Sequence, residues 1–540
     1  MISRRHVLGV GGTALATAAF PRPGAAAQRP RRGGTVTIRA WDPPHFDPVL
    51  TISYKTHVVT SFTHSRLVRH RAGPGVKPGS FPLEGDLAES WQQTNDTAYV
   101  FRLRRGVRFH NKPPVNGREL TAEDVRFSVE RLLRSPGAGN AVMLRAVDTV
   151  EAVDRYTVKF TLKKPFAWFL DMLANPMAVA IVARECVEEF GDLGKAAAAI
   201  GTGPWMLASY TPNVSITLVR HPHYFRPGLP YIDRVELHMD EDNASRTAAF
   251  LAGKYDLGWE FPGTIDRTDW VQIRDQLKRR RPGLQTAEFP SNVMNDLQMR
   301  TDKPPFNDVR VRQAISLAVD RQRIIDDTLE GVGVSNGPVP IALADLALPV
   351  TQLGEHARFY RYDPAEARQL LALAGHSGGF PARICFATYG STVLVDTMEI
   401  VLRNLKEVGI NATLDQKEYG AYVATCRLGK YDSMGFGPAA PFLEADNFVS
   451  SPHYPGEPRN RSHVNDPVLT DLLGRQQRIF DVGKRRQVIH EIQRYLAGQQ
   501  YYVHMPSPIY VGAWDRALKN YAPNLGYDYG SRLMAAWLDR

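Results

Sequence analysis

The stretch PPFNDVRVRQAISLAVDRQR, residues 304–323, carries the clearest fold signal in this 540-residue chain. Asp308 has a side chain that can cap the first turn of a helix. The apolar residues after it recur at helical spacing: Val311, Ala314, Ile315 and Ala318. Because this spacing places them on one face, the stretch predicts an amphipathic helix packed against a core.

Two further segments of the second half have the same design. Residues 363–375 begin with an aspartate and a proline and end in a glycine, which are start and stop signals of a helix. Residues 396–408 repeat the pattern, with Asp396 at the capping position. Strand patterns flank these helices at residues 382–387 and 411–414. Alternation of helix and strand predicts an α/β lobe.

The first half is richer in strand patterns. Apolar residues alternate with polar ones in four segments: Tyr99 to Leu103, Tyr156 to Leu162, Val214 to Leu218, and Val235 to Met239. This period of two predicts sheets with one face in water. Between the first two segments, Thr121 and Asp124 form a near capping box that predicts a helix over residues 121–133.

Composition limits the function classes. Hydrophobic residues make up 43% of the chain and charged residues 23%, which is typical of globular proteins. A length of 540 residues predicts about three folded units. The net charge is +10, but no nucleic-acid-binding motif accompanies the basic residues, so we expect no nucleic-acid partner.

Cysteine and histidine usage gives no metal-binding pattern. The three cysteines, Cys186, Cys385 and Cys426, lack metal-ligand spacing. A bridge between Cys385 and Cys426 is possible in an oxidising compartment, but the sequence does not establish it. His221 and His223 flank a proline, and we expect such histidines to face solvent more often than to hold a metal.

Residues 1–27 are expected to be an export signal. SRRHVL at residues 3–8 resembles the twin-arginine motif, and residues 7–20 form an uncharged apolar stretch. Alanines at 25–27 allow cleavage before Gln28. Removing the three arginines of this segment would leave a charge of +7. Since a spanning helix needs about 20 residues, an uncleaved anchor is the less favoured alternative.

No catalytic motif stands out. Residues 252–255 lack the first glycine and the hydroxyl of a P-loop, and no nucleophile elbow occurs. His490 and Glu491 lack the second histidine of a zinc protease motif. We expect no catalytic residues, metal or cofactor, although a triad assembled from distant residues stays open.

Eight blocks, taken in order, resemble one family: the peptide- and nickel-type extracellular solute-binding proteins, family 5, of ABC importers. The blocks are GDLAESW (85–91), YVFRLRRGVRFHN (99–111), LTAEDVRFSVERLL (120–133), IGTGPW (200–205), HPHYF (221–225), PPFNDVRVRQAISLAVDRQR (304–323), DPAEARQLLALAG (363–375) and LKEVGI (405–410).

The resemblance implies an α/β, two-lobed, hinged periplasmic binding protein of type II, cluster C, with an extra subdomain. Lobe I would comprise residues 33–66, 200–283 and 505–540. The extra subdomain would comprise residues 67–199, and lobe II residues 284–504. A ligand between the lobes would stabilise the closed form.

The implied function is periplasmic capture of a peptide or peptide-like organic solute for an ABC permease and its ATPase subunits, by a monomer. The family's dipeptide binders hold the peptide ammonium with an aspartate, at the position of Ala439, and the carboxylate with an arginine, at the position of Thr388. Both charged anchors are absent, so we expect no ordinary dipeptide ligand. Glu444 or Asp446 could replace the ammonium anchor.

Four aromatic residues are candidate ligand contacts, although core packing is at least as common for such residues: Tyr54, Trp259, Tyr389 and Phe436. Phe436 stands where the family has tryptophan. A non-peptide solute, such as a modified amino acid, sugar conjugate or metal chelate, is an alternative ligand. A periplasmic hydrolase on this fold and a chaperone-like binder of unfolded chains are competing functions.

Overall fold

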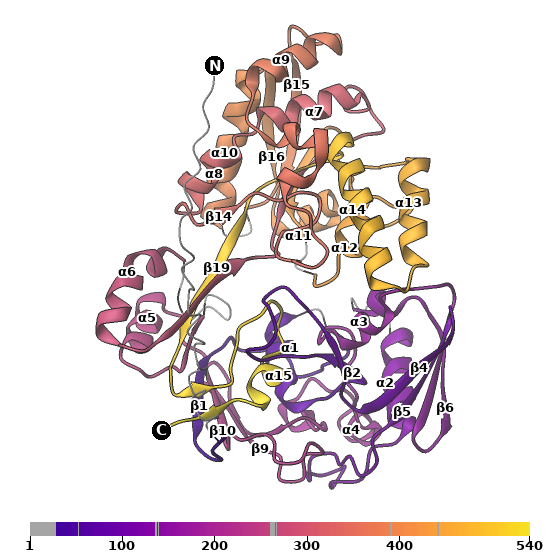
Figure 1. Ribbon diagram of the computed structural model, residues 1–540, viewed down its shortest axis with the longest axis vertical. Helices are drawn as coiled ribbons and strands as arrows, with labels where there is room; N and C mark the ends of the chain where they lie inside the picture. The colour runs from indigo at the N-terminus through magenta and orange to yellow at the C-terminus, as the bar shows by residue number, and fades with distance from the viewer. Residues whose placement is uncertain are drawn as a thin grey trace, which may run out of the picture.

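The computed structural model describes residues 29–51, 53–135, 138, 140–259, 265, 267–388, 391–439 and 442–540. The expected export signal therefore lies outside the described residues. Figure 1 shows an upper body and a lower body, and the lower body has two parts side by side. In the described part of the chain, no helix is long and apolar enough to cross a membrane.

Lobe I, at the lower left of Figure 1, is built on a sheet in the order β12-β19-β11-β1-β10-β9-β8. Its strands are β1 (Thr35–Arg39), β8 (Trp205–Thr211), β9 (Ser215–Arg220), β10 (Arg234–His238), β11 (Leu257–Trp259), β12 (Gln285–Pro290) and β19 (Ser507–Trp514). Short β14 (Gly333–Val334) pairs with β19, and β20 (Leu518–Lys519) pairs with β21 (Trp537–Leu538). The helices of lobe I are α1 (Tyr54–Thr63), α5 (Asn243–Leu251), α6 (Arg267–Arg280) and α15 (Tyr529–Met534).

The extra subdomain, at the lower right, contains a sheet in the order β4-β5-β7-β6. The strands of this sheet are β4 (Ala88–Asn95), β5 (Ala98–Leu103), β6 (Val147–Asp154) and β7 (Thr157–Leu162). A separate pair is formed by β2 (Val68–His70) and β3 (Leu83–Gly85). Its helices are α2 (Ala122–Arg134), η1 (Ala141–Leu144), α3 (Phe169–Ala174), α4 (Arg184–Phe190) and η2 (Ala196–Ala198). The expected capping of α2 is confirmed, because the Thr121 N–H donates to Asp124 Oδ2 at 2.8 Å.

Lobe II, the upper body, has a sheet in the order β16-β15-β17-β13-β18. Its strands are β13 (Asn295–Met299), β15 (Phe380–Phe386), β16 (Ile410–Gln416), β17 (Met434–Pro438) and β18 (Tyr502–His504). Its longer helices are α7 (Val309–Ala318), α8 (Arg321–Thr328), α9 (Pro364–Leu373), α10 (Thr392–Glu407), α13 (Pro467–Gln477) and α14 (Val482–Gln499). Its shorter helices are η3 (Val350–Gln352), η4 (Gly354–Tyr360), α11 (Tyr419–Ala424), η5 (Cys426–Leu428) and α12 (Asp446–Val449).

The quoted stretch at 304–323 forms α7 as predicted. Asp308 accepts a hydrogen bond from the Arg310 N–H at 2.8 Å, and the apolar stripe is buried in the lobe II core. The prediction for α10 was wrong at its start: the helix begins at Thr392, so Asp396 lies inside it. Leu394 and Met398 are buried on the stripe that continues to Val401, so core packing extends the helix beyond the expected cap.

The chain crosses between the lobes through β12 into β13 and through β18 into β19. Figure 1 shows β19 as a long strand reaching from the lower body to the upper one. Ser507 joins the crossings, because its hydroxyl donates to Val293 O at 2.5 Å and accepts from Asn336 Nδ2 at 2.6 Å. β12, which we assigned to lobe II, instead pairs along its whole length with β19 in the lobe I sheet.

Candidate functional site

In lobe I, three aromatic side chains gather where parallel strands end. β1 pairs in parallel with β10 and β11, so their carboxyl ends lie at one edge, where α/β sheets commonly bind ligands. Trp41 follows β1, and its ring meets that of Tyr54 edge to face at 5.1 Å. Tyr54 in turn stacks on Tyr527 at 5.7 Å. We call Trp41, Tyr54 and Tyr527 the aromatic face of lobe I.

A buried arginine supports this face from below. The Arg39 guanidinium lies 5.1 Å from the centre of the Trp41 ring, and its Nε donates to Asp240 O at 3.0 Å. Burial lowers the pKa of Arg39, and burial also raises the pKa of the Tyr54 hydroxyl. Tyr54 still exposes 37% of its surface, so its ring can contact a solute.

In lobe II, the matching edge is formed by β15, β16 and β17. β15 is parallel to both neighbours, so the three strands end at the same edge. The segments after β15 and β17 hold Thr388 and Ala439, the two positions without charged anchors. The Ala439 N–H donates to Met294 O at 2.8 Å, which fixes the chain as it leaves β17.

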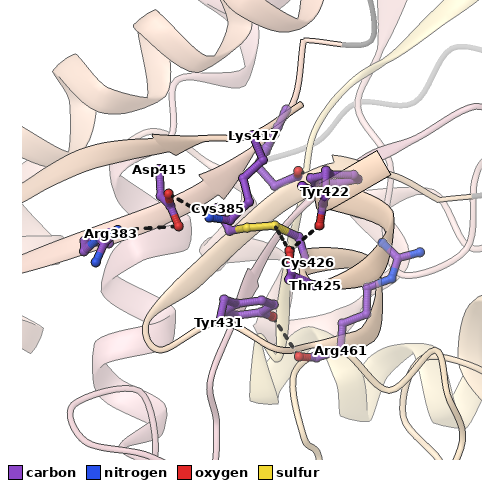
Figure 2. The surroundings of a disulfide bond; sticks show 11 residues. Arg383, Cys385, Asp415, Lys417, Tyr422, Thr425, Cys426, Tyr431 and Arg461 are labelled. Atoms are coloured by element: carbon purple, nitrogen blue, oxygen red, sulfur yellow. Dashed lines mark hydrogen bonds and ion pairs between the residues drawn. A yellow bond between two sulfur atoms is a disulfide. The ribbon is translucent and has the colours of Figure 1, made fainter. Parts of the chain in front are cut away.

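A disulfide holds the lobe II edge together. Cys385 in β15 is bonded to Cys426 in η5, the pairing that the sequence left open, with Cα atoms 6.0 Å apart. Figure 2 shows Tyr422 and Tyr431 on either side of the bridge, and the Tyr422 hydroxyl donates to Phe436 O at 3.1 Å. The bridge therefore ties η5 to β15, while Tyr422 ties α11 to β17.

The edges of the two lobes meet in the described structure. One buried cluster around Phe289 takes in Phe442 and Leu443 from the loop after β17 and also Tyr510 and Leu525 from lobe I. The approach is close at Gly526, where an added Cβ would lie 3.1 Å from the Leu443 side chain.

The extra subdomain also contacts lobe II. Arg145 pairs with Glu457 at 2.7 Å, and the Arg485 guanidinium lies 4.6 Å from the centre of the Trp168 ring. The Ala167 N–H donates to Gln477 O at 3.1 Å. Both lower parts, lobe I and the extra subdomain, therefore contact lobe II.

The four aromatic residues predicted to contact the ligand lie in different places in the structure. Tyr54 lies in the aromatic face, and β11 ends at Trp259 on the same edge of the lobe I sheet. Tyr389 lies outside the described residues. Phe436 does not fit a cleft position, because its side chain is fully buried and packs 6.0 Å from the Phe386 ring in the lobe II core.

Glu444 and Asp446 are buried and already engaged, so the expected swing toward a ligand does not match the structure. Glu444 forms an ion pair with Arg485. Asp446 Oδ1 accepts from Gln476 Nε2 at 2.6 Å and from the Ser450 hydroxyl. Burial raises the pKa of Asp446 to about 6. Both carboxylates anchor the loop to the helices of lobe II.

Sequence reasoning missed Trp41 and Tyr527. Trp41 had a usable signal, because an aromatic residue just after a strand of a parallel sheet lies at the ligand-binding edge. Tyr527 had none, because its partner Tyr54 lies at the opposite end of the chain.

The described residues contain no group of three or more histidine, cysteine, aspartate or glutamate side chains placed to hold a metal ion. His221 is buried rather than solvent-facing, with its Nε2 at 3.2 Å from Arg108 O. The His504 Nδ1 lies 2.7 Å from Asp296 Oδ1. Among the described residues, the hydrogen bonds of His504 involve Asp296 and Arg321 and no serine, threonine or cysteine.

Comparison with known proteins places this geometry in a family. Heme-binding protein A of Haemophilus influenzae is 30% identical over 436 residues, which are 76% of this chain and 74% of that protein. The probable D,D-dipeptide-binding periplasmic protein DdpA of Escherichia coli is 28% identical over 497 residues, 90% of each chain. The periplasmic binding protein DppA of Helicobacter pylori in complex with the peptide STSA has a TM-score of 0.72 at 25% identity, covering 94% of this chain and 99% of that one.

The family model described as "Bacterial extracellular solute-binding proteins, family 5 Middle" matches residues 82–458. The matched region contains most of the extra subdomain, much of the lobe I sheet and most of lobe II. Because it covers well over half of the chain, and the fold has the two lobes and crossing strands described above, this protein belongs to family 5 of the bacterial extracellular solute-binding proteins.

Proposed function

We propose that this protein is the periplasmic binding component of an ABC importer that captures a peptide-like or other organic solute between its lobes. The observation that carries the proposal is the aromatic face of lobe I, held at the carboxyl ends of parallel strands opposite the loop after β17. Flat rings at this edge can stack on an aromatic or apolar part of a solute. Closure would then remove that part from water.

The proposed ligand is not an ordinary zwitterionic dipeptide. Ala439 and Thr388 supply no charge, and Glu444 and Asp446 are held by groups of lobe II. Burying an ammonium group without a carboxylate partner costs several kcal/mol. The similar Escherichia coli protein is named for D,D-dipeptides, so a D,D-dipeptide is the alternative ligand that the tests must include.

Mass spectrometry of solutes released from protein purified from its own periplasm tests this proposal directly. We expect a bound organic molecule that carries an aromatic or apolar group. Calorimetry with L-dipeptides and D-Ala-D-Ala provides the second arm. A dissociation constant near 1 μM, which is a binding free energy of about −8 kcal/mol, for either peptide class would contradict the proposed ligand class. The proposed role as a solute-binding protein would still stand.

Lobe closure is the proposed signal to the permease. The solute should contact both lobes and so favour the closed form over the open one. Small-angle X-ray scattering should give a smaller radius of gyration with the solute than without it, at a mass that fits a monomer. A saturating solute that leaves the scattering curve unchanged would remove closure from the mechanism.

Export through the twin-arginine route is proposed on the residues at 3–8 and the alanines at 25–27. Replacement of Arg4 and Arg5 by lysine should leave the precursor in the cytoplasm. Fractionation followed by immunoblotting measures this, and substitution of His6 by glutamine is the matched control. Normal periplasmic accumulation of the double-lysine variant would assign export to another route.

A further inference from the structure

Three arginines of lobe II come together beside the loop that follows β17. Arg427, next to the disulfide in η5, donates from Nη1 to Pro438 O at 2.6 Å, at the last residue of β17. The Arg459 guanidinium lies 4.5 Å from the centre of the Phe442 ring in the same loop. Arg461 exposes only 7% of its surface. We call Arg427, Arg459 and Arg461 the arginine cluster.

Two members of the cluster have no anionic partner in the described chain. Among the described residues, neither Arg459 nor Arg461 forms an ion pair with a carboxylate, and Arg461 Nε is buried without a hydrogen bond. The nearby acid, Glu457, is paired with Arg145 at 2.7 Å. In Figure 2, the dashed line at Arg461 ends on its carbonyl oxygen, which accepts from the Tyr431 hydroxyl at 2.7 Å.

The cluster members also repel one another. The pKa of Arg459 is lowered to about 10, first by burial and then by the positive charges of Arg461, Arg427 and Arg145. Glu457 offsets only part of this repulsion at Arg459, where it is the last of the contributions to the pKa. Buried like charges are unfavourable, and a bound oxyanion beside Arg459 and Arg461 would relieve both the burial and the repulsion. A protein that keeps such a group near its ligand-binding edge has donors ready for an anion from outside the chain.

The scaffold fixes the main chain that carries Arg427 and Arg461. The disulfide fixes Cys426, the residue before Arg427. The turn at Gly429 lies against the Arg461 main chain, where an added Cβ would come within 2.8 Å of its carbonyl oxygen. The Tyr431 bond fixes the same carbonyl. Preorganised donors lose little conformational entropy on binding, which favours affinity.

We infer that the arginine cluster is an anion subsite that binds a carboxylate or phosphate group of the solute. This inference rests on the proposed function, because it makes the cluster one end of the ligand site and the aromatic face of lobe I the other. The substrate class is then an organic anion with an aromatic or apolar portion and no free ammonium group. Such a solute satisfies the guanidinium groups without needing the absent acidic anchor.

Anion binding can be measured without knowing the natural solute. The probes are inorganic phosphate, N-acetyl-L-phenylalanine and N-acetyl-L-phenylalanine amide, titrated against ligand-stripped protein in calorimetry and thermal melts at constant ionic strength. We expect saturable binding of one or both anions and none of the neutral amide. Phosphate binding without carboxylate binding would assign a phosphorylated solute, and the reverse would assign a carboxylate.

Arg461→Met is the decisive variant. We expect the affinity for the bound anion to fall at least tenfold, while the melting temperature without anion stays equal or rises, because an unpaired buried charge has been removed. An arginine that only supports the fold would give the opposite result, a lower melting temperature with unchanged anion affinity. Arg383→Met is the matched control, since Arg383 lies in the same lobe with 68% of its side chain exposed.

General stabilisation of proteins by phosphate acts equally on wild type, Arg461→Met and Arg383→Met, so the difference between variants isolates the site. Equal anion affinity in all three proteins overturns the subsite, even if a co-purified solute supports the binding function. Anion binding that is lost in Arg461→Met supports the subsite, even if no solute closes the lobes. Arg427→Met provides a second test if Arg461→Met does not fold.

Discussion

Lobe II buries arginines in two contrasting ways. Arg321, at the start of α8, is 3% exposed, and its guanidinium donates to His504 O and Ser316 O at 3.0 Å each and to the Ser316 hydroxyl at 2.9 Å. Arg461 is 7% exposed and has a buried Nε with no partner in the described chain. Neither of these two arginines forms an ion pair with a described carboxylate.

The difference distinguishes an arginine that stabilises the fold from one that we propose binds a ligand. Desolvation opposes the charge of both, and it lowers the pKa of Arg321 to about 10. Arg321 offsets this cost with carbonyl and hydroxyl dipoles of its own lobe. Arg461 Nε has no hydrogen-bond partner that offsets its desolvation. A bound anion would supply the missing interaction.

The largest effect is expected for Arg321→Met. Removing the guanidinium leaves buried carbonyl oxygens without donors, so the free energy of unfolding should fall by about 4 kcal/mol. Urea denaturation followed by circular dichroism measures this. Arg323→Met in the same helix, with 47% of its side chain exposed, should change stability by less than about 0.5 kcal/mol. Similar losses in the two variants would show that the buried hydrogen bonds of Arg321 do not stabilise lobe II.

Glu444→Ala would turn a paired buried arginine into an unpaired one. Arg485 would then keep its charge without the carboxylate, and the free energy of unfolding should fall by about 3 kcal/mol. Replacing both residues at once, as Glu444→Leu with Arg485→Met, should recover much of the loss. Glu491→Ala removes an acid that is 52% exposed in its pair with Arg475 and is the control. An unchanged free energy of unfolding in Glu444→Ala would show that buried Arg485 does not depend on its carboxylate partner for stability.

Local patterns were sufficient to predict the framework of the fold. The caps at Asp308 and Thr121 and the alternation in β5 and β7 involve residues close in sequence, so their meaning does not depend on distant partners. The start of α10 was missed because burial of Leu394 in the lobe II core outweighed the capping preference of Asp396. Tertiary packing of this kind has no local signal.

The candidate site was less predictable because its residues meet only in space. Glu444 was expected at a ligand, but its partner Arg485 comes from α14, a helix that the local sequence around Glu444 does not indicate. Tyr54 was predicted, yet Tyr527 could be found only by folding the chain. The arginine cluster likewise joins η5 to the segment before α13, and nothing in either segment shows that they meet.

Asp446→Asn tests the network around Arg485 through pH. The folded pKa of Asp446, about 6, lies above its value of about 3.9 in unfolded chains. The folded protein therefore holds a proton that the unfolded chain releases, and stability falls as pH rises from about 4 to about 6. The asparagine variant should lack this fall, so its stability relative to wild type should rise by about 3 kcal/mol between those pH values. Asp432→Asn, at a 91% exposed side chain, is the control.

The smallest effect is expected for Arg461→Lys. A lysine keeps the positive charge but removes the buried Nε that has no partner, so the free energy of unfolding should change by less than about 0.5 kcal/mol. Phosphate binding should weaken only severalfold, since an ammonium group also binds phosphate as a point charge. Arg321→Lys provides the contrast, because one ammonium group cannot reach all the oxygen atoms that Arg321 satisfies, and a loss of about 2 kcal/mol is expected. Equal urea midpoints for the two lysine variants would show that lobe II uses both arginines in the same structural way.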